Sequence, residues 1–172
     1  MNLLKVGLPM LLLAGIVACA DPPPVTTGFR TMQAGESAPS FSGPDIDGVV
    51  HAIGSEQPVT LLNMWATWCG PCIEEFPDLQ QIHDDMASNG FRVLGVSVDD
   101  VDPEAIRAFG KNLGVTFPLM VDPSGTLQDR YRSAAVPSTF LIDKEGKIVR
   151  TWTGRLPTGA HEEISTYLRT IQ

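Results

Sequence analysis

The hydrophobic positions change period several times along the chain, and the changes predict alternating strands and helices. Residues 59–65 (VTLLNMW) form a short apolar run, as expected of a strand buried on both faces. Apolar side chains then recur at spacings of three and four through residues 71–86, which predicts a helix packed on a sheet. Residues 91–98 predict a second strand and residues 103–113 a second helix. This order favours parallel pairing of the two strands.

The later part of the chain predicts a further short strand, an antiparallel pair and two helices: strands over 117–121, 138–142 and 147–152, and helices over 127–131 and 161–171. The antiparallel pair is expected because only a short polar connection, residues 143–146, joins its strands. Residues 34–53 contain DGVVHAI and predict a small leading hairpin added to one edge of the sheet. Together these elements predict an α/β fold in which helices flank a central mixed sheet.

The N-terminal residues predict export rather than a place in the fold. Lys5 precedes an apolar run over residues 8–17 that is typical of a signal-peptide core and too short to span a bilayer. Residues 16–19 (IVAC) resemble the lipobox of bacterial lipoproteins, whose cysteine is acylated. We therefore expect a signal peptide over 1–18, a proline-rich, lipid-anchored tether over 19–33 beginning at Cys19, and one domain over 34–172. An ordinary secretory signal with an incidental Cys19 is the alternative.

Composition and charge narrow the classes of partner. The chain has 172 residues, 43% of them hydrophobic, which suffices for one packed domain once the signal is discounted. Its formal net charge of −8 argues against nucleic acid, because phosphates require basic clusters that this sequence lacks. Of the three cysteines, assigning Cys19 to lipid leaves a single pair, Cys69 and Cys72.

This cysteine pair allows three interpretations. A structural disulfide is disfavoured, because closing so short a loop removes little entropy from the unfolded chain. A closed zinc site needs four ligands, and no spacing pairs the histidines of the chain with these cysteines. A redox pair fits, because Cys69 would stand at the N-terminus of the predicted helix, where the helix dipole and unpaired N–H groups stabilise a thiolate. Cys72, one turn further, would then resolve a mixed disulfide.

The stretch LLNMWATWCGPCIEEFP, residues 61–77, resembles the TlpA/ResA-type thiol-disulfide oxidoreductases of the thioredoxin superfamily. The likeness extends from about Gly35 to Gly154. It implies a thioredoxin fold with an N-terminal β-hairpin and an inserted strand-helix segment, which we place at about residues 99–121.

The resemblance also implies roles for residues around the cysteines. Pro137 matches the family's cis-proline, which would leave the backbone of Val136 free to pair with a bound peptide. Glu75, one helical turn after Cys72, matches a glutamate suited to shuttling the Cys72 proton, whereas Asn63 stands where thioredoxins have a buried aspartate. Trp68, as an exposed aromatic residue, is expected to cover the cysteines and meet the substrate.

These inferences predict an exported thiol-disulfide oxidoreductase in which Cys69 attacks and Cys72 resolves, with no cofactor and no metal. Family likeness implies the reduction of disulfides in exported proteins, including cytochrome c maturation. With lipid at Cys19, we expect a monomer anchored at the extracytoplasmic face of a bacterial membrane and supplied by an upstream membrane thiol donor.

Two rival functions share the predicted fold. A peroxidase of the peroxiredoxin type requires a Pro-x-x-x-Thr/Ser-x-x-Cys setting, but Leu62 and Ala66 occupy the corresponding positions before Cys69. A metallochaperone or assembly module would use the fold only as a binding surface. Insulin reduction that is lost in Cys69→Ser argues against such a module, and stoichiometric copper binding argues for it.

Overall fold

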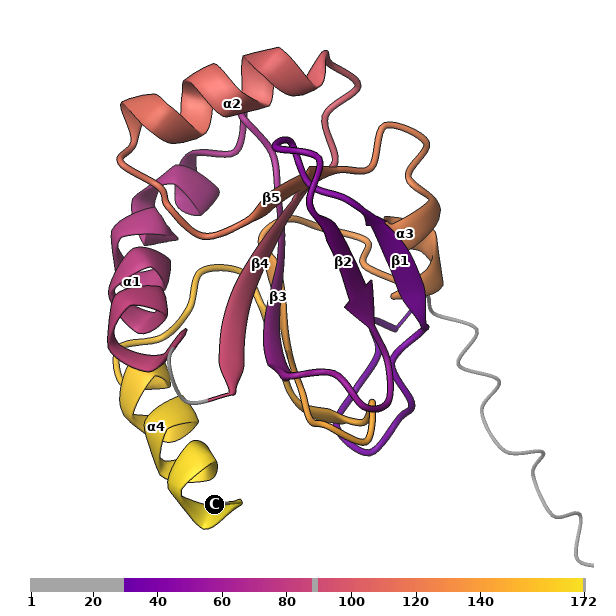
Figure 1. The fold of residues 1–172 in the computed structure, drawn as a ribbon, viewed down its shortest axis with the longest axis vertical. Coiled ribbons are helices and arrows are strands. Elements are labelled where there is room, and N and C mark those ends of the chain that lie inside the picture. The colour runs from indigo at the N-terminus through magenta and orange to yellow at the C-terminus, as the bar shows by residue number, and fades with distance from the viewer. Residues whose placement is uncertain (1–29, 88–89, 172) are drawn as a thin grey trace, which may run out of the picture.

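Every strand and helix predicted from residue 59 onward is present, with ends within two residues of the predicted ones (Figure 1). The computed structural model describes residues 30–87 and 90–171. The elements in chain order are β1 (Phe41–Pro44), β2 (Val50–Ile53), β3 (Val59–Trp65), α1 (Gly70–Met86), β4 (Phe91–Ser97), α2 (Pro103–Asn112), β5 (Leu119–Val121), α3 (Thr126–Arg130), β6 (Ser138–Ile142), β7 (Ile148–Thr153) and α4 (Ala160–Thr170).

Five strands form the central sheet in the order β5-β4-β3-β6-β7. β3, β4 and β5 run parallel, whereas β6 pairs antiparallel with both β3 and β7. The sheet is therefore mixed, and its fold is that of thioredoxin, as predicted. β3 is central and all seven of its residues are buried, which explains its nearly continuous apolar sequence.

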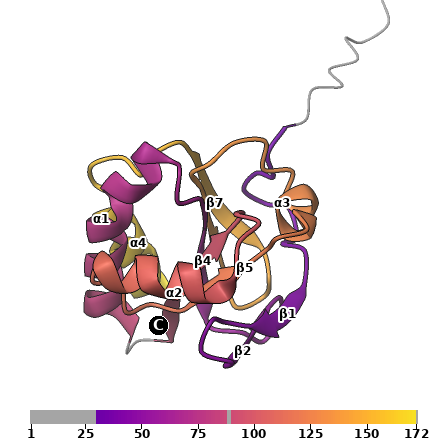
Figure 2. The ribbon, with the colours of Figure 1, turned by 90° about the horizontal axis from the view of Figure 1, so that it is seen from above.

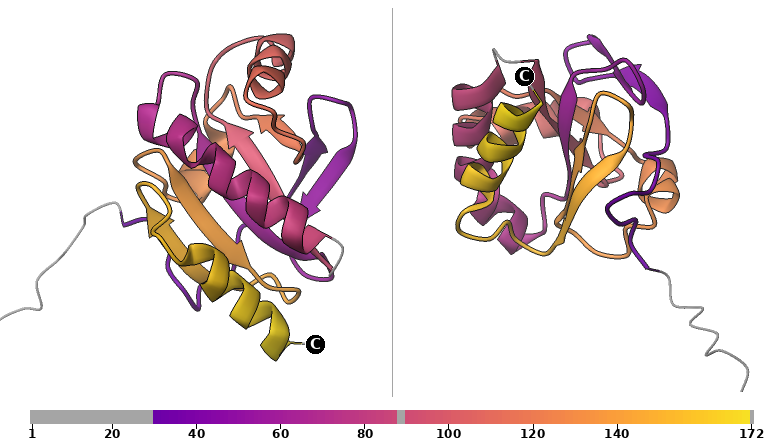
Figure 3. Two further views of the ribbon diagram at one scale, coloured as in Figure 1. Left: turned by 90° about the vertical axis from the view of Figure 1, so that its left-hand side faces the viewer. Right: turned by 90° about the horizontal axis from the view of Figure 1, so that it is seen from below.

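Helices cover the sheet on both faces (Figure 2). α1 and α4 lie side by side across one face, where their apolar side chains join the core cluster that contains Leu61 and Trp65 of β3 (Figure 3). The short helix α3 and the β1–β2 hairpin cover the other face. The predicted insertion over 99–121 consists of α2 followed by β5, and β5 forms one edge of the sheet.

The leading hairpin is present, but its predicted attachment to the sheet edge is wrong. β1 and β2 form a separate two-stranded antiparallel sheet. The connecting turn is hydrogen-bonded to the edge strand, where the Ile46 amide donates to the Leu119 carbonyl at 2.8 Å. Ile53 and Phe41 instead pack into the core beneath the sheet, so burial of these two side chains decides the position of the hairpin.

Core contacts extend to Met32, near the end of the segment that the sequence assigns to the tether. Met32 is buried in the same core cluster as Tyr131. Its amide donates to the Tyr131 carbonyl, and its carbonyl accepts from the Thr151 hydroxyl. The signal peptide, Cys19 and residues 19–29 of the tether lie outside the described residues. In the part of the chain that the structure describes, no helix combines the length and the apolar character needed to cross a membrane.

Candidate active site

The predicted redox pair lies where β3 ends and α1 begins. A tight turn follows β3, closed by the Cys69 amide, which donates to the Ala66 carbonyl at 3.1 Å. Cys69 has an extended backbone and is the N-cap of α1, and Pro71 occupies the first turn, where its missing N–H leaves no carbonyl unpaired. The change from strand to helix therefore delivers Cys69 to the positive end of the helix dipole.

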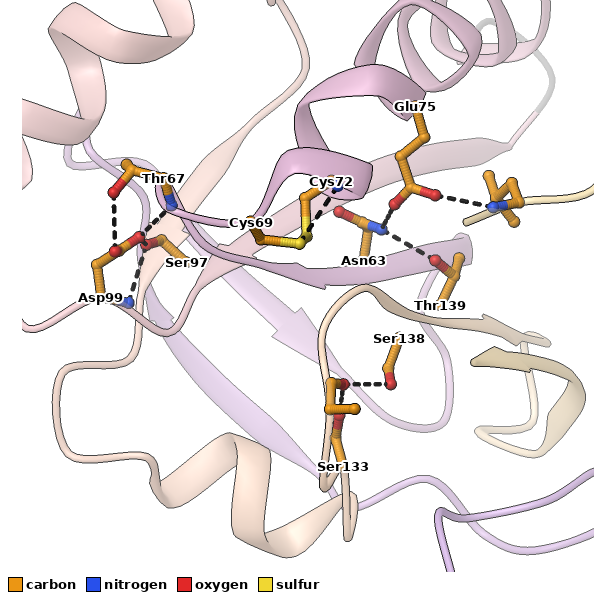
Figure 4. The surroundings of a disulfide bond; sticks show 12 residues. Asn63, Thr67, Cys69, Cys72, Glu75, Ser97, Asp99, Ser133, Ser138 and Thr139 are labelled. Carbon is orange, nitrogen blue, oxygen red and sulfur yellow. Dashed lines mark hydrogen bonds between the residues drawn. A yellow bond between two sulfur atoms is a disulfide. The ribbon is translucent and has the colours of Figure 1, made fainter. Parts of the chain in front are cut away.

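Cys69 and Cys72 form a disulfide, with their Cα atoms 5.3 Å apart. The Cys72 amide donates to Cys69 Sγ at 3.3 Å, so a backbone N–H of the first turn points at the sulfur (Figure 4). Cys69 is 5% exposed and Cys72 is fully buried. Cys69 is therefore the sulfur that a substrate can reach, and Cys72 is placed to attack Cys69 from within the fold.

Glu75 lies one turn below Cys72 and is completely buried, whereas its neighbour Glu74 is exposed. Both Glu75 oxygens accept hydrogen bonds: Oε1 from Asn63 Nδ2 and Oε2 from the Leu156 amide, each at 2.8 Å (Figure 4). Burial nevertheless dominates and raises the pKa of Glu75 to about 7, although these hydrogen bonds and Arg155 lower it. A carboxyl group with this pKa can accept and return a proton near neutral pH.

The buried carboxyl group makes stability depend on pH. An unfolded glutamate titrates near 4.5 and the folded one near 7, so the folded state binds the extra proton between these values. Stability relative to Glu75→Gln is therefore highest below this window and falls as the pH rises through it. We expect this difference in the free energy of unfolding to fall by up to about 3 kcal/mol between about pH 4 and about pH 8. Urea unfolding of both proteins measures the difference, and a constant value across this range would contradict the assignment.

Asp99 supports the loop before Cys69, a role that its place in an acidic run does not predict. Asp102, in the same run, is the N-cap of α2. Asp99 is instead buried and accepts from the Thr67 amide at 2.8 Å, the Thr67 hydroxyl at 2.9 Å and the Ser97 hydroxyl at 2.7 Å (Figure 4). One carboxylate thus ties the end of β4 to the turn that carries the nucleophile.

Replacing Asp99 with alanine should destabilise the protein by about 1–3 kcal/mol, because the part-buried Thr67 amide loses its acceptor. Asp99→Asn is the matched control. The amide oxygen of the asparagine can accept the hydrogen bonds that Asp99 Oδ2 accepts. Its NH₂ group can donate to the oxygen of the Thr67 hydroxyl group. Chemical denaturation measures both variants. An Asp99→Ala protein as stable as the Asp99→Asn protein would show that the loop does not depend on this carboxylate.

The residue before β6 lies beside the redox loop. β6 pairs with β3 through Ser138 and Met64, so Pro137 is level with Trp65, near the start of the loop that carries Cys69. The Val136–Pro137 peptide bond is cis, as the resemblance implied, and Pro137 is buried. Among the described residues, neither the amide nor the carbonyl of Val136 has a hydrogen-bond partner. These groups are thus available to an extended peptide laid across the disulfide.

The hydroxyl groups of Ser133 and Ser138 both donate to the Ala135 carbonyl, at 3.1 and 2.7 Å, and fix the loop that presents Val136 (Figure 4). Trp68 stands beside Cys69 and is 71% exposed, whereas Trp65 is fully buried and packs on Phe76. The structure thus separates the two tryptophans as predicted, one on the surface and one in the core. Contact of Trp68 with substrate stays a prediction.

Within residues 30–87 and 90–171, no cluster of three or more histidine, cysteine or acidic side chains could hold a metal ion. The reactive groups that the structure places together are the two sulfurs of Cys69 and Cys72 and the Glu75 carboxyl group. A thioredoxin fold with a Cys-x-x-Cys disulfide at a helix N-terminus, facing a cis-proline, defines the class of thiol-disulfide oxidoreductases.

Comparison with known proteins supports this class. The model of the AhpC/TSA family matches residues 34–151. Thiol-disulfide oxidoreductase ResA of Geobacillus thermodenitrificans is 32% identical over 85% of this chain and 82% of its own. The crystal structure of StoA from Bacillus subtilis has a TM-score of 0.64 at 26% identity, covering 76% of this chain and 96% of StoA. A secreted thiol-disulfide isomerase from Corynebacterium glutamicum has a TM-score of 0.65 at 25% identity, covering 76% and 84%.

The chain belongs to the AhpC/TSA family and, within it, to the ResA-like thiol-disulfide oxidoreductases. It is an enzyme that exchanges dithiols and disulfides.

Proposed function

We propose that this enzyme works outside the cytoplasm as a reductant of disulfides in exported proteins, held at a membrane by lipid on Cys19. The direction of the reaction, towards reduction of the substrate, is inferred from the groups that surround the two sulfurs. Among the described residues, the only hydrogen bond to Cys69 Sγ comes from the Cys72 amide, and the nearest buried ionisable group on α1 is the acid Glu75. A thiolate stabilised by the helix alone favours the disulfide more than one stabilised further by a cation.

A measured reduction potential tests this direction. Equilibration with a glutathione or dithiothreitol buffer should place the Cys69/Cys72 couple nearer to about −270 mV, as in thioredoxin, than to about −120 mV, as in DsbA. A value above about −180 mV would instead indicate an oxidase or isomerase and would overturn the proposal.

Export and anchoring are supported by the N-terminal sequence. The apolar run over residues 8–17 and the IVAC motif favour lipidation at Cys19, and one structural relative is described as secreted. Labelling of cells with a palmitate analogue should mark the wild-type chain and leave Cys19→Ala unmarked. Equal labelling, or none in either protein, would contradict the anchor.

The substrate class proposed includes apocytochrome c, with an upstream membrane thiol donor supplying electrons to a monomeric enzyme. A peptide containing oxidised Cys-x-x-Cys-His, the haem attachment motif, is the probe. The reduced enzyme should reduce it and should form a mixed disulfide with it when Cys72 is replaced by serine. Reduction of insulin with no reaction at this peptide would exclude this substrate class. Peroxide consumption by the Cys72→Ser protein would support the rival peroxidase instead.

A further inference from the structure

Asn63 is a polar residue in the middle of β3, a strand in which every residue is buried. Side chains of β3 alternate between the two core clusters, and Leu61 and Trp65 on either side of Asn63 pack against α1. Asn63 faces the same layer and is completely buried. A polar side chain at this position is retained only if its hydrogen-bonding groups have partners.

Only half of the Asn63 amide has partners. Nδ2 donates to Glu75 Oε1 at 2.8 Å and to Thr139 Oγ1 at 2.9 Å, so both of its hydrogens are used. Among the described residues, the buried Oδ1 has no hydrogen-bond partner. This oxygen lies on the side of the disulfide, and the amide stands between the Cys72 sulfur and the Glu75 carboxyl group (Figure 4). The oxidised site thus holds an acceptor without a donor, which points to the side of a disulfide whose sulfurs carry no proton (Figure 4).

The observed orientation of the amide suits an ionised Glu75. Both carboxyl oxygens accept, Oε1 from Asn63 and Oε2 from the Leu156 amide, which leaves no acceptor for a proton on Oε1. If Oε1 is protonated, its O–H meets an NH₂ group, and two donors cannot pair. Turning the amide by half a rotation removes the conflict. Oδ1 then accepts from the Glu75 hydroxyl, and Nδ2 faces the Cys72 sulfur.

We propose that the Asn63 side chain is a two-position hydrogen-bond switch that couples the proton on Cys72 to the proton on Glu75. This inference rests on the proton role expected of Glu75. In the first position, Oδ1 accepts from the Cys72 thiol and Nδ2 donates to the Glu75 carboxylate. In the second, Nδ2 donates to the Cys72 thiolate and Oδ1 accepts from the Glu75 carboxylic acid. One proton leaves Cys72 Sγ and ends on Glu75 Oε1, and the number of hydrogen bonds is the same before and after.

The surroundings of the amide fit both positions. Thr139, the cross-strand partner of Asn63, carries a hydroxyl group that accepts from Nδ2 in the first position and can donate to Oδ1 in the second. The charged groups that face Glu75 are Arg155, from the loop before α4, and Asp78 on α1. They act on Glu75 in opposite directions, and the side chain that hydrogen-bonds to the Glu75 carboxyl group is that of Asn63.

The position of the Asn63 amide sets the acidity of the Cys72 thiol. When a substrate forms a mixed disulfide with Cys69, Cys72 must lose its proton before its sulfur attacks Cys69 and releases the reduced substrate. The second position stabilises that thiolate with an N–H donor inside an apolar layer, where a hydrogen bond to a charged group is strong. Asn63 is thus a positioning residue that acts through Glu75 and Cys72.

A double-mutant cycle on the Cys72 titration tests the switch. Cysteine labelled with ¹³C at Cβ reports the apparent pKa of Cys72 in the reduced wild type, Glu75→Gln, Asn63→Leu and the double variant. Glu75→Gln should shift this pKa in the wild-type background and should shift it less than half as much in the Asn63→Leu background. Thr139→Val is the matched control, because it removes the other partner of Nδ2 and should keep the full shift. An equal shift with and without Asn63 would overturn the switch.

A second measurement avoids variants that fail to fold. In the reduced wild-type protein, ¹⁵N-labelled Asn63 should show side-chain NH₂ resonances that titrate with the same midpoint as the Glu75 carboxyl carbon. Contacts from these hydrogens to the Cys72 Cβ protons should appear only once Cys72 is ionised. Contacts that stay unchanged across the titration would overturn the switch. A protein that shows the coupling but reduces no protein disulfide would contradict the proposed function and leave the switch supported.

Discussion

Replacing Cys69 with serine should reduce the rate of protein-disulfide reduction to that of the uncatalysed reaction, the largest effect we expect from any single substitution. Cys69 is the more exposed sulfur of the pair and the N-cap of α1, so the thiolate that attacks a substrate can form only there. Insulin reduction followed by turbidity, with dithiothreitol as the electron source, measures this loss.

Cys72→Ser is the companion variant, and it should stop the reaction at a later step. Cys69 still attacks, but the mixed disulfide has no buried thiol to resolve it, so the covalent complex should accumulate and release substrate when a reductant is added. Non-reducing electrophoresis shows this complex. If Cys72→Ser retains full turnover, Cys72 is not the resolving residue.

Replacing Glu75 with glutamine should slow the resolving step by about 10²-fold or more, the range expected for loss of a general base. Glu75 accepts the Cys72 proton only when ionised, so the wild-type rate of resolution should fall as the pH drops through about 7, the pKa that burial gives this carboxyl group. Glutamine has no such titration, and this limb of the pH profile should disappear. Stopped-flow measurement of tryptophan fluorescence, which Trp68 and Trp65 should report, follows the step.

The matched control for this substitution is Glu74→Gln. Glu74 is the adjacent residue of α1, is exposed, and accepts a hydrogen bond from Arg155 with its side chain. Its pH profile should equal that of the wild type. If Glu75→Gln and Glu74→Gln behave alike, the proton of Cys72 is exchanged directly with solvent, and the buried carboxyl group has no part in the reaction.

The redox centre could be predicted from sequence because its determinants are local. The change of period after Trp65 fixes where the strand ends and the helix begins, and four residues then decide which sulfur is the N-cap. Glu75 could be placed on the buried side of α1 from its spacing to Cys72 alone. The resemblance to a known family supplied what spacing could not, the cis peptide bond before Pro137.

Other features depend on contacts between distant parts of the chain. Asp99 looked like part of an acidic loop, because its partner Thr67 lies 32 residues earlier. The sequence predicts the hairpin at an edge of the sheet. Its actual position depends on the burial of Ile53 beneath the sheet, a contact that forms only in the folded protein. Asn63 carried a usable signal: a polar residue in a strand buried on both faces requires buried partners. That signal predicts a polar contact but does not say that Glu75 and Thr139 provide it.

Nucleophilic attack by Cys69 requires that the N-terminus of α1 stabilise its sulfur as a thiolate. The rate of iodoacetamide alkylation of the reduced protein, measured against pH in a Cys72→Ser background, reports the pKa of Cys69 directly. We expect a midpoint clearly below the value of about 8.5 found for free cysteine. A midpoint at or above that value would mean that the helix does not activate this sulfur, and the account of the site would be wrong.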